Sequence, residues 1–95
     1  MLERTFQSKL IKELKERFPG SIVTKNDSYK QGLPDVLILY KDKWAMLECK
    51  KSEHEPRQPN QEYYVKKLNS MSFSRFIYPE NKETVLNELQ HAFES

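Results

Sequence analysis

The chain has 95 residues, 37% of them hydrophobic, which is enough for one domain over residues 1–95 with a small core. No apolar run approaches the ~20 residues of a transmembrane helix, and the first residues form no apolar signal segment. A single cysteine excludes an internal disulfide. We therefore expect a cytoplasmic protein. The net charge of +2 is unevenly distributed. Residues 1–75 contain fifteen Lys/Arg and ten Asp/Glu, a net charge of +5, and residues 76–95 contain one Lys and four Glu, a net charge of −3. The basic first part favours a polyanionic partner, although ordinary surface solvation would give the same charges.

The first predicted element is an amphipathic helix over residues 2–18. Lysine and glutamate occupy its outer faces, and Pro19 with Gly20 ends it. Glu3 lies on the flank of the apolar stripe, three residues before the first phenylalanine. The apolar residues recur at helical spacing: Leu2, Phe6, Leu10, Ile11, Leu14 and Phe18.

A short strand is predicted over residues 21–26, followed by a polar loop over residues 27–33. Side chains in this part of the chain are well placed to reach a phosphate backbone, although an ordinary solvated loop has the same composition. Tyr29 is a candidate for stacking on a base, but packing in the core or at its rim is the commoner role of such a residue. The candidates for phosphate contacts here are Lys25, Asn26, Lys30 and Gln31.

Two apolar runs rich in strand-forming residues then predict a β-hairpin, with strands over residues 35–40 and 43–50. Pro34 has no N–H to donate to a sheet, so it belongs at the start of the first strand. This position puts Asp35 at the mouth of the sheet rather than in its middle.

The length of the hairpin loop decides whether two carboxylates face each other. If the loop has two residues, Tyr40 pairs with Lys43, and Asp35 lies opposite Glu48 with Cβ atoms roughly 4.5–5.5 Å apart. A three-residue loop shifts the register by one and turns Asp35 to the other face, unless a bulge re-aims it. Lys50 follows Glu48 by two residues, so both side chains lie on one face of the strand.

The second half of the chain adds a helix, a strand and another helix. Asn60 is the expected N-cap of the first of these helices, with Gln61 in its first turn. Lys51 and Arg57, in the charged loop before it, are further candidates for phosphate contacts. The predicted bounds are a loop over residues 51–59, a helix over residues 61–70, a strand over residues 73–78 and a helix over residues 82–94.

The order of helix, three strands, helix, strand and helix predicts an α/β fold. A helix between the third and fourth strands implies a crossover connection, which suits parallel pairing of these two strands. The sheet would therefore be mixed, with helices packed on its faces.

Two carboxylates that lie close together repel each other, so one must bind a proton or a cation must lie between them. Hard oxygen ligands without nearby His or Cys partners favour Mg²⁺ or Mn²⁺. The amine of Lys50 could orient a water on such an ion or stabilise negative charge on a phosphate. Considered one at a time, these residues could also have structural roles. Asp35 could cap a turn, and Glu48 could pair with Lys50.

Pro34 and Asp35, followed thirteen residues later by Glu48-x-Lys50, resemble the PD-(D/E)XK nuclease superfamily. With Gly32, the early Glu3 and the later Gln61, the sequence is similar to the VRR-NUC branch, which is often virus- or prophage-encoded and includes Holliday-junction-resolvase-like nucleases. The resemblance runs from about Glu3 to about Leu68. It implies a restriction-endonuclease-like αβββαβ core with a mixed four-stranded sheet, to which this chain adds a C-terminal helix.

The resemblance also implies roles for individual residues. Asp35 and Glu48 would hold Mg²⁺ or Mn²⁺, together with the backbone carbonyl of Cys49. Lys50 would act on the attacking water. Two further positions would support the site, one reaching the metal through a water and one lying beside it: Glu3 and Gln61.

We therefore predict a metal-dependent DNA endonuclease that hydrolyses phosphodiester bonds. Branched DNA or both strands of a duplex would call for a homodimer with two such sites. One alternative is a nucleic-acid-binding module that does not cleave, against which the clustered carboxylates argue. Another is a nuclease component that acts only with a helicase or recombinase partner.

Overall fold

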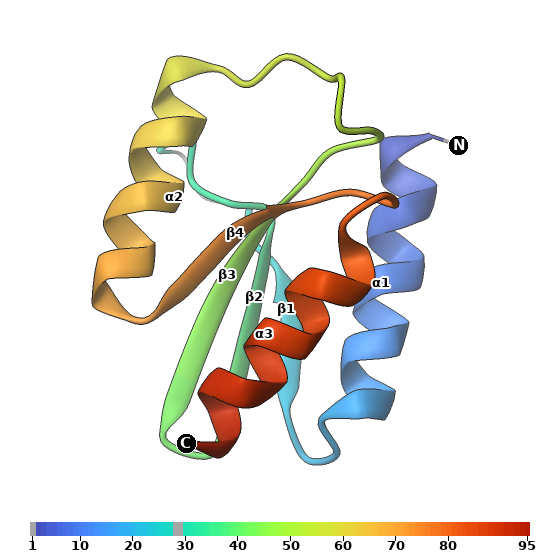
Figure 1. The fold of residues 1–95 in the computed structure, drawn as a ribbon, viewed down its shortest axis with the longest axis vertical. Coiled ribbons are helices and arrows are strands. Elements are labelled where there is room, and N and C mark those ends of the chain that lie inside the picture. Colours follow the sequence, from blue (N-terminus) through green and yellow to red (C-terminus); the bar gives the residue numbers. More distant parts are fainter. Residues whose placement is uncertain (1, 28–29) are drawn as a thin grey trace.

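The computed structural model of the chain describes residues 2–27 and 30–95 (Figure 1). The predicted order of elements is confirmed. Among the described residues, no helix is both long enough and apolar enough to cross a membrane. The elements are α1 (Glu3–Arg17), β1 (Ile22–Lys25), β2 (Val36–Tyr40), β3 (Lys43–Cys49), α2 (Pro59–Met71), β4 (Phe73–Ile77) and α3 (Lys82–Glu94).

The four strands form one mixed sheet in the order β1-β2-β3-β4. β1 and β2 are antiparallel, as are β2 and β3, whereas β3 and β4 are parallel. The parallel pair requires a crossover, and α2 provides it, as the sequence predicts.

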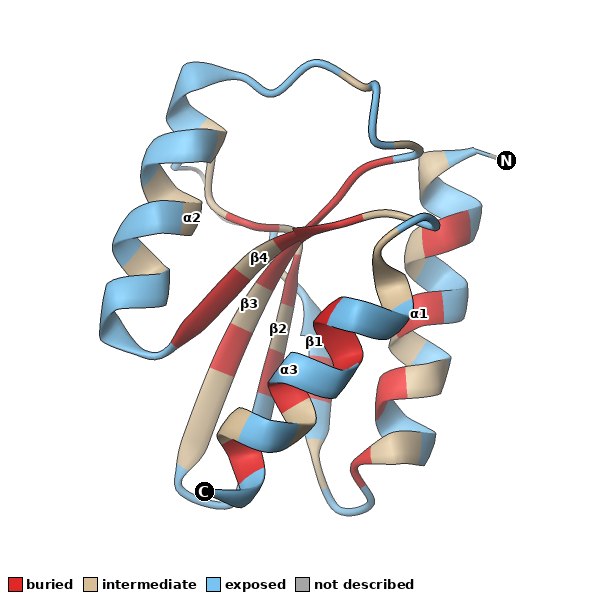
Figure 2. Cartoon of the chain, viewed as in Figure 1, coloured by how far each residue is buried: buried red, intermediate tan, exposed pale blue. Residues whose placement is uncertain are grey.

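The sheet lies between helices on both faces. α1 and α3 cover one face and α2 lies against the other (Figure 1). The buried residues lie in the sheet and on α1 and α3, whereas α2 contains no buried residue (Figure 2). The largest fully buried apolar side chains include Leu10, Leu14, Ile38, Leu47, Ile77, Leu86 and Leu89.

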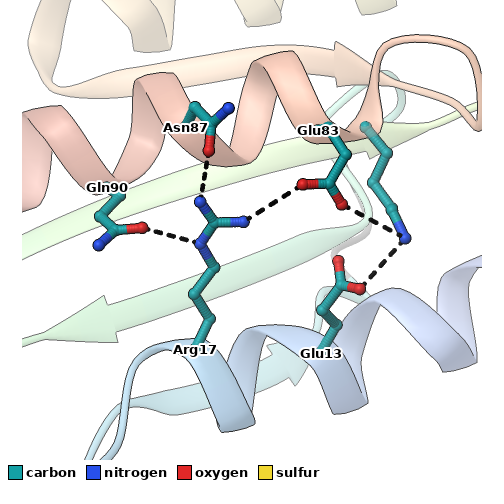
Figure 3. A network of polar contacts seen from close by, with 6 residues as sticks. Glu13, Arg17, Glu83, Asn87 and Gln90 are labelled. Atoms are coloured by element: carbon teal, nitrogen blue, oxygen red, sulfur yellow. Dashed lines mark hydrogen bonds and ion pairs between the residues drawn. The ribbon is translucent and has the colours of Figure 1, made fainter.

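Polar side chains join α1 to α3 outside this core (Figure 3). The Arg17 guanidinium donates to Gln90 at 2.9 Å and lies 3.7 Å from the Glu83 carboxylate. Lys82 donates to Glu13 at 3.1 Å. Each surface ion pair contributes little alone, but together these contacts hold α1, which carries Glu3 at its start, against the rest of the fold.

α2 begins two residues earlier than predicted. Its first residue is Pro59, and Gln58 rather than Asn60 is the N-cap, so the predicted capping role of Asn60 is wrong. Proline is favoured at the first helical position because it has no N–H to leave unpaired and its φ is already helical. The Gln61 side chain accepts a hydrogen bond from the Gln58 N–H at 3.0 Å, which satisfies one donor at the helix start.

Candidate functional site

The β2–β3 hairpin has the two-residue loop that brings the carboxylates together. Val36 pairs with Leu47 and Tyr40 with Lys43, and continuing this register places Asp35 opposite Glu48. The two carboxyl groups share a hydrogen bond. The convergence expected for a two-residue loop is therefore present.

Asp35 is held from both neighbouring strands. The Cys49 N–H donates to its Oδ2 at 3.2 Å. On the other side, the Asn26 N–H donates to the Asp35 carbonyl at 2.7 Å, and the Asn26 side-chain amide donates to the Pro34 carbonyl at 3.1 Å. Asn26 was a candidate for phosphate contacts, but its amide helps to position the Pro34–Asp35 segment.

Lys50, Glu48 and Gln61 form a hydrogen-bonded chain. The Lys50 Nζ donates to the Gln61 Oε1 at 2.8 Å, and the Gln61 Nε2 donates to the Glu48 Oε2 at 3.1 Å. Lys50 also donates to the Pro56 carbonyl at 3.1 Å. Glu48 is only 3% exposed and Lys50 only 5%. Charged residues are rarely buried so deeply unless they are paired, and here Gln61 joins the carboxylate to the amine.

The electrostatics of the carboxyl pair favour retention of a proton. Burial, reinforced by the charge of Asp35, raises the pKa of Glu48 to about 8, although the Lys50 charge opposes this. Burial also raises the pKa of Asp35, which the Cys49 N–H partly offsets. Near neutral pH the protonated Glu48 therefore donates to the Asp35 carboxylate.

Cys49 itself offers no nucleophile. Its side chain is fully buried, and burial raises the pKa of the thiol above its ordinary value. The thiol form is the poor nucleophile of the two protonation states. Only the backbone of Cys49 therefore has a place in the site.

A third carboxylate, Glu3, lies near the pair, and a fourth, Glu55, is hydrogen-bonded to Glu3. Burial, together with a hydrogen bond to Glu55, raises the pKa of Glu3 to about 6, and the charge of Asp35 adds to this shift. Glu55 comes from the loop before α2, where the Lys51 N–H donates to it at 2.9 Å and lowers its pKa. Glu55 was not among the predicted site residues, because a loop has no periodicity that would indicate its direction.

The donor set fits a hard divalent ion, although no three His, Cys, Asp or Glu side chains within residues 2–27 and 30–95 form a ready-made metal site. Mg²⁺ commonly takes only one or two carboxylates and keeps several waters. A divalent ion bound by Asp35 and Glu48 would take the place of the proton in the hydrogen bond between them. A hollow of about 340 Å³, lined in part by Glu3, Lys25 and Asp35, opens beside them and gives access to solvent.

The other predicted phosphate contacts differ in their surroundings. Lys25 lines the hollow with Glu3 and Asp35. Lys30 and Lys51 are exposed, and Gln31 lines a second hollow of about 370 Å³ at the start of α2. The exposed Arg57 lies over the ring of Phe76, 4.1 Å from its centroid. Tyr29 lies outside the residues that the structure describes.

Gly32 allows the loop before Asp35 to pack on the start of α2. Its φ is +98°, and an added Cβ would lie 2.5 Å from the Asn60 Cβ and 2.9 Å from the Asn60 carbonyl carbon. Both the backbone conformation and the close approach require glycine. This contact brings the segment that carries Asp35 next to the helix that carries Gln61.

Gly32→Ala is therefore expected to destabilise the protein by about 2–4 kcal/mol, because it combines backbone strain with a clash that the Asn60 backbone must absorb. Gly20→Ala is the matched control. Its φ is +88°, but nothing lies within 4 Å of an added Cβ, so it should lose only about 1–2 kcal/mol from strain. Urea unfolding measures both, and equal losses would show that the contact with Asn60 is unimportant.

Comparison with known proteins supports the architecture. No protein-family model matches the sequence, and no curated protein matches it. A solved structure described as "VRR_NUC domain" superposes with a TM-score of 0.69 at 22% sequence identity, covering 96% of this chain and 98% of that one. The chain therefore has the fold of a VRR_NUC domain, as its motifs predict.

Proposed function

We propose that the protein is a Mg²⁺- or Mn²⁺-dependent nuclease that hydrolyses phosphodiester bonds in DNA. The observation that carries this proposal is the carboxyl pair of Asp35 and Glu48, which are hydrogen-bonded to each other beside the buried amine of Lys50. Two carboxyls this close are unfavourable unless a proton or a cation lies between them, and a bound divalent ion would take the place of the proton. The likeness in fold to the VRR_NUC domain adds support.

Each side chain has a part in this chemistry. Asp35 and Glu48 would hold the ion with the Cys49 carbonyl, and Glu3 would contact it through a water. A bound divalent ion supplies charge neutralisation for the phosphate and makes a water at the site more acidic. Lys50 orients that water or stabilises the negative charge that develops on the phosphate. Gln61 positions Lys50, because its Oε1 accepts a hydrogen bond from the ammonium group.

The substrate surface follows from the position of the cations. Lys25 lines the hollow that opens on Asp35, so its amine would meet the phosphate next to the one that is cut. Lys30, Gln31, Lys51 and Arg57 extend the contact to either side. A homodimer with two such sites remains our expectation for branched DNA.

A cleavage panel tests the proposal. The purified protein is incubated with a four-way junction, a linear duplex and a single strand, in Mg²⁺, Mn²⁺ or EDTA. We expect cleavage in Mg²⁺ or Mn²⁺ and none in EDTA. Cleavage that persists in EDTA would overturn the proposed metal dependence.

The panel also separates the two alternatives. Binding of DNA and metal without cleavage would indicate the non-cleaving module. Cleavage that appears only when a helicase or recombinase is added would indicate a component nuclease. In either case the activity proposed for the protein alone would be wrong.

A further inference from the structure

Two hollows meet on the surface of α2. One, of about 400 Å³, is lined by Tyr63, Lys66, Lys67 and Ser70. The other, also of about 400 Å³, lies between α2 and β4, and its basic residues are Arg57, Lys66 and Arg75. Lys66 lines both, so the two hollows adjoin at this residue. We call this region the α2 surface: Arg57, Tyr63, Lys66, Lys67 and Arg75.

The α2 surface is basic. Among the described residues that line the two hollows, Glu62 alone carries a carboxylate. Among the described residues, Arg57, Lys66 and Lys67 form no ion pair, whereas Arg75 lies 3.3 Å from Glu88. Residues 76–95 are acidic by contrast. Three cations therefore remain available to a polyanion on this side of the molecule.

Arg57 lies next to the residues Asp35, Glu48, Lys50 and Gln61, which we call the catalytic cluster. Its guanidinium carbon lies over the buried Phe76 ring, 4.1 Å from the centroid. This cation–π contact restrains the guanidinium, whose N–H groups can bind phosphate oxygens. Arg75 lies over Phe73 at 4.2 Å, but Glu88 already accepts a hydrogen bond from its Nε.

Tyr63 supplies an exposed aromatic ring beside Lys66 and Lys67, with which it lines one of the hollows. Its side chain is 60% exposed, and its ring meets the edge of Tyr64 at 5.0 Å between centroids with an interplanar angle of 82°. Tyr64 thus orients the ring while leaving it open to solvent. An exposed aromatic ring among lysines is the usual arrangement for stacking an unpaired base.

The α2 surface adjoins the catalytic cluster. Pro56, whose carbonyl accepts a hydrogen bond from Lys50, directly precedes Arg57. Tyr63 follows Gln61 by two residues, so its ring lies on the side of α2 away from the cluster. Arg57 shares one hollow with Lys66, and Lys66 shares the other with Lys67 and Tyr63. A strand that leaves the cluster past Arg57 therefore meets Lys66 next and then Lys67 and Tyr63.

We propose that the α2 surface binds a single-stranded segment of the substrate, with phosphates on Arg57, Lys66 and Lys67 and an unpaired base stacked on Tyr63. This inference rests on the proposed function and names its substrate class. The site acts on nucleic acid that has a single-stranded part next to the bond that is cut, such as a flap, a branch or an overhang.

Binding without cleavage tests the proposal. Fluorescence anisotropy in EDTA measures the Kd of a labelled oligothymidine of about 16 nucleotides, the upper end of common single-strand site sizes. Tyr63→Ala should weaken binding about 10-fold, and Tyr63→Phe, which keeps the ring, should bind as the wild type does. The double variant Lys66→Ala/Lys67→Ala should reduce the slope of log K against log salt by about 1.4, or about 0.7 for each phosphate contact.

The matched control is Lys9→Ala/Lys12→Ala, which removes the same charge from exposed positions of α1. It should leave the Kd close to that of the wild type. The inference is overturned if this control weakens binding as much as the α2 variant does, or if Tyr63→Ala binds like Tyr63→Phe. It is also overturned if a duplex of the same length binds as tightly as the single strand.

These outcomes are separate from those of the cleavage panel. Single-strand binding that depends on Tyr63, combined with no cleavage in any metal, would overturn the proposed nuclease activity alone. Cleavage of a flap by Tyr63→Ala at the wild-type rate, with unchanged Kd, would overturn the α2 surface alone. Thermal unfolding of each variant checks that the fold is intact, since all the substituted side chains are exposed or half-buried.

Discussion

Glu48→Gln is expected to abolish cleavage and, at the same time, to stabilise the metal-free protein. The amide removes the negative charge that holds the ion, so we expect the rate of cleavage in Mg²⁺ to fall at least about 10³-fold, the upper range for loss of one electrostatic group at a catalytic centre. A cleavage assay with saturating DNA measures this loss.

The gain in stability has a separate physical cause. Glu48 is 3% exposed and its pKa is about 8, so at pH 8 part of the folded population must carry a buried charge. Glutamine has the same shape and no charge, and its carbonyl oxygen can still accept from Gln61. The free energy of unfolding in EDTA at about pH 8 should therefore rise by about 1–2 kcal/mol, in the range of single stabilising substitutions.

The opposite signs of the two effects make the prediction specific. A variant that loses activity because it misfolds would also lose stability. Glu16→Gln, at an exposed position of α1, makes the same chemical change and should alter neither quantity. If Glu48→Gln lowered the stability in EDTA, a structural role for the carboxylate would replace the catalytic one.

The position of the carboxyl pair is predictable from sequence because few alternatives exist for a short hairpin. Side chains alternate along a strand, so the loop length alone determines whether Asp35 faces Glu48. The structure has the two-residue loop, with Lys41 at a φ of +57°, and not the three-residue one. Lys50 follows from the same alternation, since it lies two residues after Glu48.

The supporting residues depend on tertiary packing, which sequence patterns do not contain. Glu55 reaches Glu3 because the loop before α2 folds back, with the Glu55 N–H bonded to the Ser52 carbonyl. Asn26 bonds the Pro34 carbonyl only because β1 pairs with β2. A polar side chain in a loop looks the same in sequence whether it binds a ligand or the backbone.

Helix α2 illustrates a second limit. Met71 follows Tyr64 and Leu68 at helical spacing, yet it is 63% exposed, and α2 contains no buried residue. Periodicity indicates which side of a helix is apolar but not how much of that side the sheet covers. The exposure of α2 is what leaves Tyr63 and its neighbouring lysines open to a ligand.

The second large effect concerns pH and metal together: without metal, the fold is expected to lose stability as the pH rises from about 4.5 to about 8. The pKa of Glu48 is raised from 4.5 to about 8, so the folded chain keeps a proton that the unfolded chain releases. The stability linked to this proton is complete below the unfolded pKa and is lost as the pH passes the folded pKa.

Other carboxyls do not reverse this trend. The pKa of Glu3 is raised from 4.5 to about 6, so its contribution has the same sign over the lower part of the window. The pKa of Glu55 is lowered from 4.5, so the stability linked to it is lost only as the pH falls below that value, outside the window.

Mg²⁺ should remove the loss at high pH, because the ion takes the place of the shared proton between Asp35 and Glu48. An ion present at 100 times its Kd adds about 2.7 kcal/mol to the free energy of unfolding, which corresponds to a rise in Tm of about 10–20 °C for a domain of this size. At about pH 5 the proton competes with the ion, so the rise in Tm should be much smaller there than at about pH 8.

Thermal unfolding in Mg²⁺ and in EDTA, at both pH values and with ionic strength matched by NaCl, measures this difference. In Glu48→Gln the rise in Tm should be small at both pH values, since neither the proton nor the ion is then bound by this side chain. Equal rises in the wild type at both pH values would mean that the ion binds elsewhere. Asp35 and Glu48 would then be a partly buried pair that shares a proton and holds no metal, and a metal-dependent cleavage site would have to be sought away from the β2–β3 hairpin.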